Sequence, residues 1–314
     1  MGIRLFDWRD FPILLRYRHR GLFFDNASVL TRGEMLVPIG AMLSYFAHAL
    51  GIYTFLYTDD DQDSEPILGQ VTHGQGEEVA KLSFLAPETV LEADKTLDIL
   101  DRMAQQIGNR GAFHLVAEVQ ERSAAFDKLR DSAFALYVHQ RIWKCPQEVQ
   151  VKTNPSQWRD IRSTDLIAVR SLYSTLVPAL VQQVELLPAE NLKGLVYYLE
   201  EELLAYADIR YGQRGIWVQP YIHPDARGVT DQLGDLLQNL PNRHSRPVYL
   251  CVRSYQSWLD NSLEDLQAQP GPLQAVMVKH LAIGKKVRNS FSLPALEGGQ
   301  QEVTTPFMQS ERYE

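Results

Sequence analysis

The sequence predicts two α/β domains in tandem, of the α+β kind, each a mixed, mainly antiparallel sheet flanked by helices. Three observations predict this: a pattern of segments that occurs twice, a length that suits two domains, and an ordinary globular composition. The chain has 314 residues, of which 45% are hydrophobic and 22% charged. These values are typical of a folded protein with two cores. The expected boundaries are an N-terminal domain at 1–150, a C-terminal domain at 151–285 and a flexible tail at 286–314.

Four segments of the first half recur in the same order in the second half. The pairs are 3–4 with 158–159, 36–38 with 176–178, 84–88 with 221–225, and 115–119 with 249–253. The offset between partners falls stepwise from 155 to 140, 137 and 134 residues, so order is kept while loops differ in length. A repeat of this length predicts a duplicated domain, because each copy is large enough to bury its own core.

Each copy is expected to run strand, one or two helices, several strands, then helix, strand, helix, strand. Asp10 and Asp165 are placed to cap the first helix of each copy. The first copy is expected to contain strand 3–6, helices from 11 and at 39–50, strands 52–57, 67–71 and 78–85, helix 97–107, strand 113–119, helix 123–130 and strand 134–143. The second is expected to contain a helix from 166, strands 194–199, 203–211 and 215–222, helix 229–240, strand 247–252, helix 255–266 and strand 273–281. Residues 145–157, with two prolines, are the expected linker.

Composition also limits the partners. A net charge of −8 argues against nonspecific nucleic-acid binding, because few cations remain to neutralise phosphates. Two distant cysteines, Cys145 and Cys251, exclude a disulfide framework and fit a cytoplasmic location. The histidines lack metal-ligand spacing, so no metal is expected. Residues 36–58 carry no Asp, Glu, Lys or Arg, but Pro38 and Gly51 interrupt them, which favours a buried helix and strand over a membrane span.

A predicted strand ends at residue 222 and is followed by Arg227 and Gly228 at a predicted helix start. With the order of elements given twice, this segment resembles the GNAT superfamily of acyl-CoA N-acyltransferases, over residues 1–144 and 157–283. In that family the fourth strand leads into Arg/Gln-x-x-Gly-x-Gly/Ala, whose backbone N–H groups bind the pyrophosphate of acetyl-CoA at a helix N-terminus. The open edge of the strand pairs with pantetheine as an added strand would. The resemblance implies acetyl-CoA as acyl donor, bound by Ile222, His223, Arg227, Gly228, Val229 and Thr230.

The motif departs from the family pattern in both copies. Thr230 and Gln232 stand where glycine and glycine or alanine are expected. In the first copy, residues 88–94 contain no arginine or glycine, and their three carboxylates would repel a pyrophosphate. The resemblance therefore implies a cofactor site in the C-terminal copy and a non-catalytic N-terminal copy.

The catalytic candidates are Asp208 and Tyr255. The family's general acid is a tyrosine in the helix after the fifth strand, but Leu129 and Leu263 stand at that place, so Tyr255 is the expected substitute. Asp208 lies on an otherwise apolar strand and is the expected general base. Strand alternation places it on the same face as Arg210, so an ion pair between these two side chains is the alternative interpretation.

Two functions remain open. The first is an N-acyltransferase, with acetyl-CoA as donor, that modifies an amine of a small molecule or peptide in the C-terminal copy of a monomer or homodimer. The second is a duplicated fold that has lost catalysis and serves as a ligand-binding or protein-interaction module. The N-acyltransferase is the expected function, because attack of an amine on a thioester depends mainly on positioning and does not require the tyrosine acid. The incomplete motifs and the two leucines at the acid position favour the second function, which is the alternative.

Overall fold

The computed structural model describes residues 2–17, 20–33, 51–58, 65–92, 95–149, 156–188 and 192–281. Residues 1–283 belong to one compact unit. The predicted helix at 39–50, residues 150–155 of the predicted linker and the predicted tail lie outside the described residues. In the described ranges, none of the helices has the length and apolar character needed to cross a bilayer.

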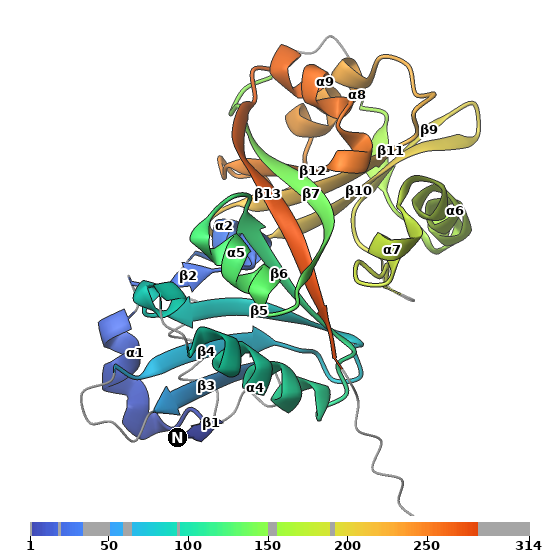
Figure 1. Cartoon of the computed structure of the whole chain (residues 1–314). Helices are drawn as coiled ribbons and strands as arrows, with labels where there is room; N and C mark the ends of the chain where they lie inside the picture. The colour runs from blue at the N-terminus through green and yellow to red at the C-terminus, as the bar shows by residue number, and fades with distance from the viewer. Residues whose placement is uncertain are drawn as a thin grey trace, which may run out of the picture. The chain divides into compact units, whose positions relative to one another are not determined.

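A single sheet runs through both copies (Figure 1). The strands of the first copy are β1 (Gly2–Leu5), β2 (Leu22–Phe23), β3 (Ile52–Thr58), β4 (Ile67–Thr72), β5 (Val79–Ala86), β6 (His114–Gln120) and β7 (Ala135–Cys145). Those of the second are β8 (Trp158–Asp160), β9 (Leu195–Leu199), β10 (Glu202–Tyr211), β11 (Ile216–Ile222), β12 (Val248–Arg253) and β13 (Gln269–His280). Among the described strands, β5 pairs with β6 and β11 with β12 in parallel, and the other pairs are antiparallel. The predicted mixed, mainly antiparallel sheets are confirmed.

The two copies exchange their last strands. The sheet order is β1-β3-β4-β5-β6-β13-β7-β12-β11-β10-β9-β8. β7, from the first copy, pairs with β12 of the second, and β13, from the second copy, pairs with β6 of the first. The two exchanged strands also pair with each other at the centre of the sheet. Each half of the sheet is therefore completed by a strand of the other copy.

Helices cover both faces of each half. In the first copy, α4 (Thr96–Gly108) and α5 (Ala124–Asp131) pack on one face, and α1 (Phe11–Tyr17) packs on the other. In the second, α8 (Val229–Gln238) and α9 (Leu259–Asp265) pack on one face, and α6 (Leu166–Leu176) and α7 (Ala179–Gln182) on the other. The exchange reaches the cores, because Met277 of β13 lies in the first-copy core and Trp143 of β7 in the second-copy core.

An arginine–aspartate pair marks the start of each copy. Arg4 donates two hydrogen bonds of 2.6 Å to the Asp10 carboxylate, and Arg159 donates two, of 2.7 and 2.8 Å, to Asp165. Each carboxylate also accepts the backbone N–H of the residue three positions earlier. Each aspartate thus stabilises the turn that precedes the helix. The sequence had predicted instead that it would cap the helix by accepting N–H groups of the residues that follow it. The same geometry at both places supports the duplication.

The Asp165 pair yields an acid-dependent stability prediction. Hydrogen bonds from Arg159 hold the pKa of Asp165 well below its ordinary value, against the opposing effect of burial. A lowered carboxyl pKa stabilises the fold above the unfolded-state pKa of about 4 and loses that effect as pH falls. At pH 7 we expect Asp165→Asn to unfold about 2 kcal/mol more easily, with the difference shrinking below pH 4. Urea unfolding across pH, with the exposed Asp160→Asn as control, measures this; a difference independent of pH would contradict it.

The first copy also contains an insertion that has no counterpart in the second. It comprises β2 and α2 (Asn26–Arg32), and it falls between the repeated segments where the offset drops from 155 to 140 residues. Ala27 of α2 packs against Trp217 and Cys251 of the second copy. The Arg214 N–H donates to the Thr31 carbonyl (2.9 Å). The insertion therefore ties the first copy to the second.

Candidate functional site

Each copy has one place where two parallel strands pair and then separate. β11 and β12 pair from Ile216 to Val218, and β5 and β6 pair from Val79 to Lys81. We call the separation of β5 and β6 the first fork and that of β11 and β12 the second fork. Beyond each fork one strand edge is left with backbone groups that need partners. These edges are where the GNAT resemblance expects pantetheine.

At the second fork, the side chain of Gln256 bonds the free edge of β11. The Ile222 N–H donates to Gln256 Oε1 (2.8 Å), and Gln256 Nε2 donates to the Pro220 carbonyl (2.8 Å). Gln256 is only 1% exposed. One side-chain amide thus forms the two hydrogen bonds that an added strand would form.

At the first fork, the chain itself supplies the added strand. β2 pairs with β5 at Leu22 and Phe23. The Phe24 N–H donates to the Ser83 carbonyl (3.1 Å), and the Glu118 N–H of β6 donates to the Phe24 carbonyl (2.8 Å). Residues 22–24 therefore bridge the two separated strands and occupy the first fork.

The two forks are closed at matching positions. At the 137-residue offset that relates these segments, Ser83 corresponds to Pro220. The carbonyl of each accepts a hydrogen bond from the chain, one from a backbone amide and one from a glutamine side chain. The backbone atoms that the resemblance expects to bind pantetheine are therefore bonded within the chain itself at both forks.

The predicted phosphate-binding residues gather at the start of α8. Arg227 is exposed, and its carbonyl accepts a hydrogen bond from Gln232 Nε2 (2.8 Å). Gly228 has φ +66°, a left-handed conformation that suits glycine, and Val229 and Thr230 begin the helix. His223 Nδ1 accepts the Asp225 N–H (3.3 Å). Their role in phosphate binding stays a prediction.

The two predicted catalytic residues lie in different settings. Asp208 accepts two hydrogen bonds of 3.2 Å from Arg210, which is the ion pair considered as the alternative. Tyr255 packs against the buried cluster that contains Tyr173 and Tyr221. Burial, with the nearby Glu185 carboxylate, raises the pKa of Tyr255 well above its ordinary value. Its hydroxyl is buried and bonds to none of the described residues.

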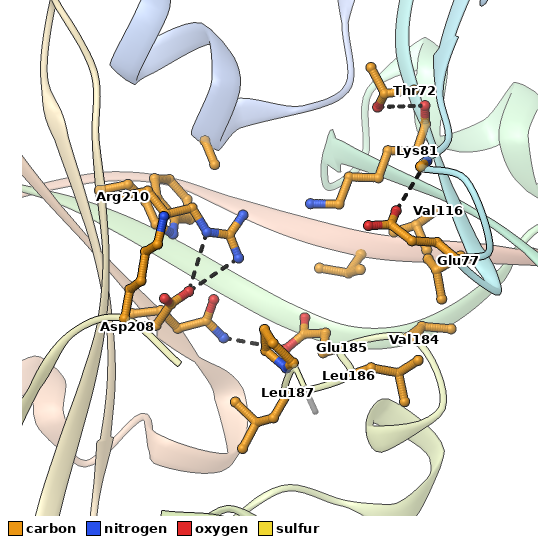
Figure 2. Close-up of a pocket in the computed structure, with 18 of the residues that line it drawn as sticks. Thr72, Glu77, Lys81, Val116, Val184, Glu185, Leu186, Leu187, Asp208 and Arg210 are labelled. Carbon is orange, nitrogen blue, oxygen red and sulfur yellow. Dashed lines mark hydrogen bonds and ion pairs between the residues drawn. The ribbon is translucent and has the colours of Figure 1, made fainter. Parts of the chain in front are cut away.

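A cavity of about 1030 Å³ lies between the copies. Strands β5 and β6 line it from the first copy, and β10, β11 and residues 184–188 from the second. Figure 2 shows the Lys81 ammonium pointing into it, towards the wall that carries Asp208 and Arg210. Cavities of this size are typical of small-molecule sites.

A buried polar network lies along this cavity. Arg253, 5% exposed, forms an ion pair with Glu185 and donates to Gln140 Oε1. Gln140 Nε2 donates to Gln274 Oε1 (2.8 Å), which also accepts from Asn26 Nδ2 (3.0 Å). The network thus passes through both exchanged strands.

Sequence reasoning missed Gln256, Lys81 and Glu185 as residues of these sites. A glutamine early in a helix carries no pattern that indicates a strand-edge partner. Lys81 lies in a predicted strand, where a lysine normally indicates a solvated face. The offset between the repeated segments falls from 155 at residues 3–4 to 140 at residues 36–38. This fall was the one signal in the sequence for the insertion that occupies the first fork.

No family model matches the sequence, and no curated protein matches it. Solved structures do match. A GCN5-related N-acetyltransferase from Sphaerobacter thermophilus is 11% identical with a TM-score of 0.55, over 89% of this chain and 95% of its own. A putative acetyltransferase from Pyrococcus horikoshii is 11% identical with a TM-score of 0.51, over 91% of each chain. The predicted resemblance is confirmed at the level of fold: the chain has the GNAT fold.

Proposed function

We propose that this tandem GNAT-fold protein binds a small molecule in the cavity between its copies and does not transfer acyl groups from CoA. The observation that supports this most is the bonding of the Ser83 and Pro220 carbonyls by the chain itself. To bind pantetheine, the first copy would have to expel residues 22–24, and the second would have to break both bonds of a buried amide. Losing such a pair and leaving buried groups unbonded costs about 1–3 kcal/mol per group.

Calorimetric titration with CoA and acetyl-CoA tests the proposal. We expect no binding to the wild-type chain at millimolar ligand, because neither fork offers a free strand edge. Gln256→Ala frees the Ile222 N–H and the Pro220 carbonyl, so any CoA binding is expected to emerge in that variant first. CoA binding to the wild type that Arg227→Glu abolishes, and that the exposed control Arg9→Glu leaves intact, would refute the proposal.

The same titration addresses a second candidate, an N-acyltransferase in the C-terminal copy that uses acetyl-CoA and an amine of a small molecule or peptide. The observation that favours it is the smaller obstruction at the second fork, where a single side chain replaces a chain segment. Under this candidate, Ile222, Gly228 and Thr230 would bind the cofactor after Gln256 moves away. Asp208 would then have to leave Arg210 to act as a base.

A further inference from the structure

The first-copy wall of the cavity carries two opposite charges, Lys81 and Glu118. Lys81 of β5 is level with Val116 of β6, and Glu118 follows two residues later on the same face. Both residues lie at the first fork, and no ion pair joins them within the described residues. Both line the cavity.

The Lys81 ammonium has no bonded partner among the described residues. Lys81 enters the hydrogen-bond pattern through its backbone carbonyl, which accepts from Thr72 and Ser83 hydroxyls. Asp25 lies near it: burial alone would raise the pKa of that carboxyl, but Lys81 and hydrogen bonds from Ser28 hold it below its ordinary value. The Asp25 oxygens are bonded to the Ser28 N–H and hydroxyl. The three N–H donors of Lys81 are therefore left for a ligand in the cavity.

The Glu118 carboxylate is bonded on one side. Its Oε2 atom accepts both the Asn26 backbone N–H (3.0 Å) and the Asn26 Nδ2 (2.9 Å). These donors are neutral, and no cation pairs with Glu118 in the part of the chain that the structure describes. The carboxylate is held in place by neutral donors and forms no ion pair.

Two other pairs of opposite charges on the cavity wall are matched. Arg210 pairs with Asp208, and Arg253 pairs with Glu185. Glu77, Glu78 and Lys193 are exposed at the surface. Among the half-buried lysine, arginine and carboxylate side chains that line the cavity, Lys81 and Glu118 are thus the two that form no ion pair within the described residues. The apolar side chains Val79, Val116 and Val276 surround them.

We infer, resting on the proposed function, that the cavity binds a small zwitterion such as an α-amino acid, with its carboxylate on Lys81 and its ammonium on Glu118. A ligand carrying both charges satisfies both groups through charge-assisted hydrogen bonds. A dianion would leave Glu118 unmatched and be repelled by it, and a diamine would be repelled by Lys81.

The experiment is a thermal-shift screen followed by calorimetric titration on the full chain. The probes are the standard amino acids, first pooled and then singly, with succinate as the anion-only probe and putrescine as the cation-only probe. We expect at least one amino acid to bind with submillimolar affinity and the two single-sign probes to bind at least tenfold more weakly.

The variants are chosen to keep the fold. Lys81→Met and Glu118→Gln are each expected to weaken amino-acid binding at least tenfold. The ammonium of Lys81 has no hydrogen-bonded partner among the described residues to lose, and glutamine still accepts the Asn26 bonds. Lys144→Met, an exposed lysine on β7, is the matched control and is expected to change nothing. If Lys81→Met lowers the melting temperature, Lys81→Gln replaces it.

Two results overturn the inference: no shift with the pooled amino acids at 10 mM, or succinate binding that depends on Lys81 and is unaffected by Glu118→Gln. Neither result touches the proposed absence of CoA binding, which is measured in a separate titration. CoA binding to the wild type would instead refute the proposed function and leave the amino-acid data to be judged on their own.

Discussion

Cutting the chain between its copies is expected to leave the two halves bound to each other. For this test, a protease recognition site is introduced at residues 151–155, which lie outside the described residues, so that cleavage separates β7 from β8. Because β7 lies in the second half of the sheet and β13 in the first, each half keeps a strand of the other. Size-exclusion chromatography and native mass spectrometry after cleavage are expected to show one complex with both pieces in equal amounts.

Each half made alone is expected not to fold as a stable monomer. Without β13, the first copy loses Ala275 and Met277 from its core, and without β7 the second loses Trp143 and Cys145. Burying one large apolar side chain contributes about 1.5–3 kcal/mol, against a total stability of about 5–15 kcal/mol for a domain. Circular dichroism of the separate halves measures this, with the uncut chain as control. Two folded, separate monomers would show that the predicted boundary at residue 150 divides independent domains.

Replacing Arg253 is expected to be the most damaging single change in the cavity wall. Burial alone would lower the pKa of Arg253, but Glu185 raises it above its ordinary value, so the guanidinium stays charged. Arg253→Met leaves Glu185 without its cation and removes a donor to Gln140. Removing one partner of a buried ion pair costs about 3–5 kcal/mol. We therefore expect the free energy of unfolding of Arg253→Met, measured with a denaturant, to be lower than that of the wild type by about 3–5 kcal/mol.

A matched set of variants separates charge from packing. Arg253→Met with Glu185→Gln is expected to recover part of the lost stability, because no uncompensated charge then remains. Arg141→Met removes a half-buried arginine that lies 3.6 Å from Asp260 and is expected to cost less than about 1 kcal/mol. Equal losses in the Arg253 and Arg141 variants would mean that the network around Arg253 does not stabilise the fold.

Local pattern was sufficient to predict most elements of the fold. Alternation placed Ala205, Ala207 and Ile209 in the core and Asp208 with Arg210 on the other face, as the structure has them. The repeat also predicted two copies of one fold, because matching segments keep their order. These signals depend on neighbours in sequence, which periodicity reports directly.

The strand exchange could not be predicted in the same way. β7 and β13 are both long strands that follow a short helix, and nothing in their residues says whether they pair with their own copy or with the other. That choice is made by long-range contacts such as Trp143 in the second core. The closure of the forks depends likewise on a two-residue strand, β2, and on one glutamine, Gln256, neither of which has a periodic signature.

The proposed function depends on whether Gln256 keeps its hydrogen bonds to the edge of β11 when acetyl-CoA is present. A crystal structure of the wild-type chain grown with millimolar acetyl-CoA tests it directly. We predict that the Gln256 amide remains on the Ile222 N–H and the Pro220 carbonyl, with no cofactor density between β11 and β12. Pantetheine density along β11, with Gln256 turned away, would contradict it and favour the N-acyltransferase.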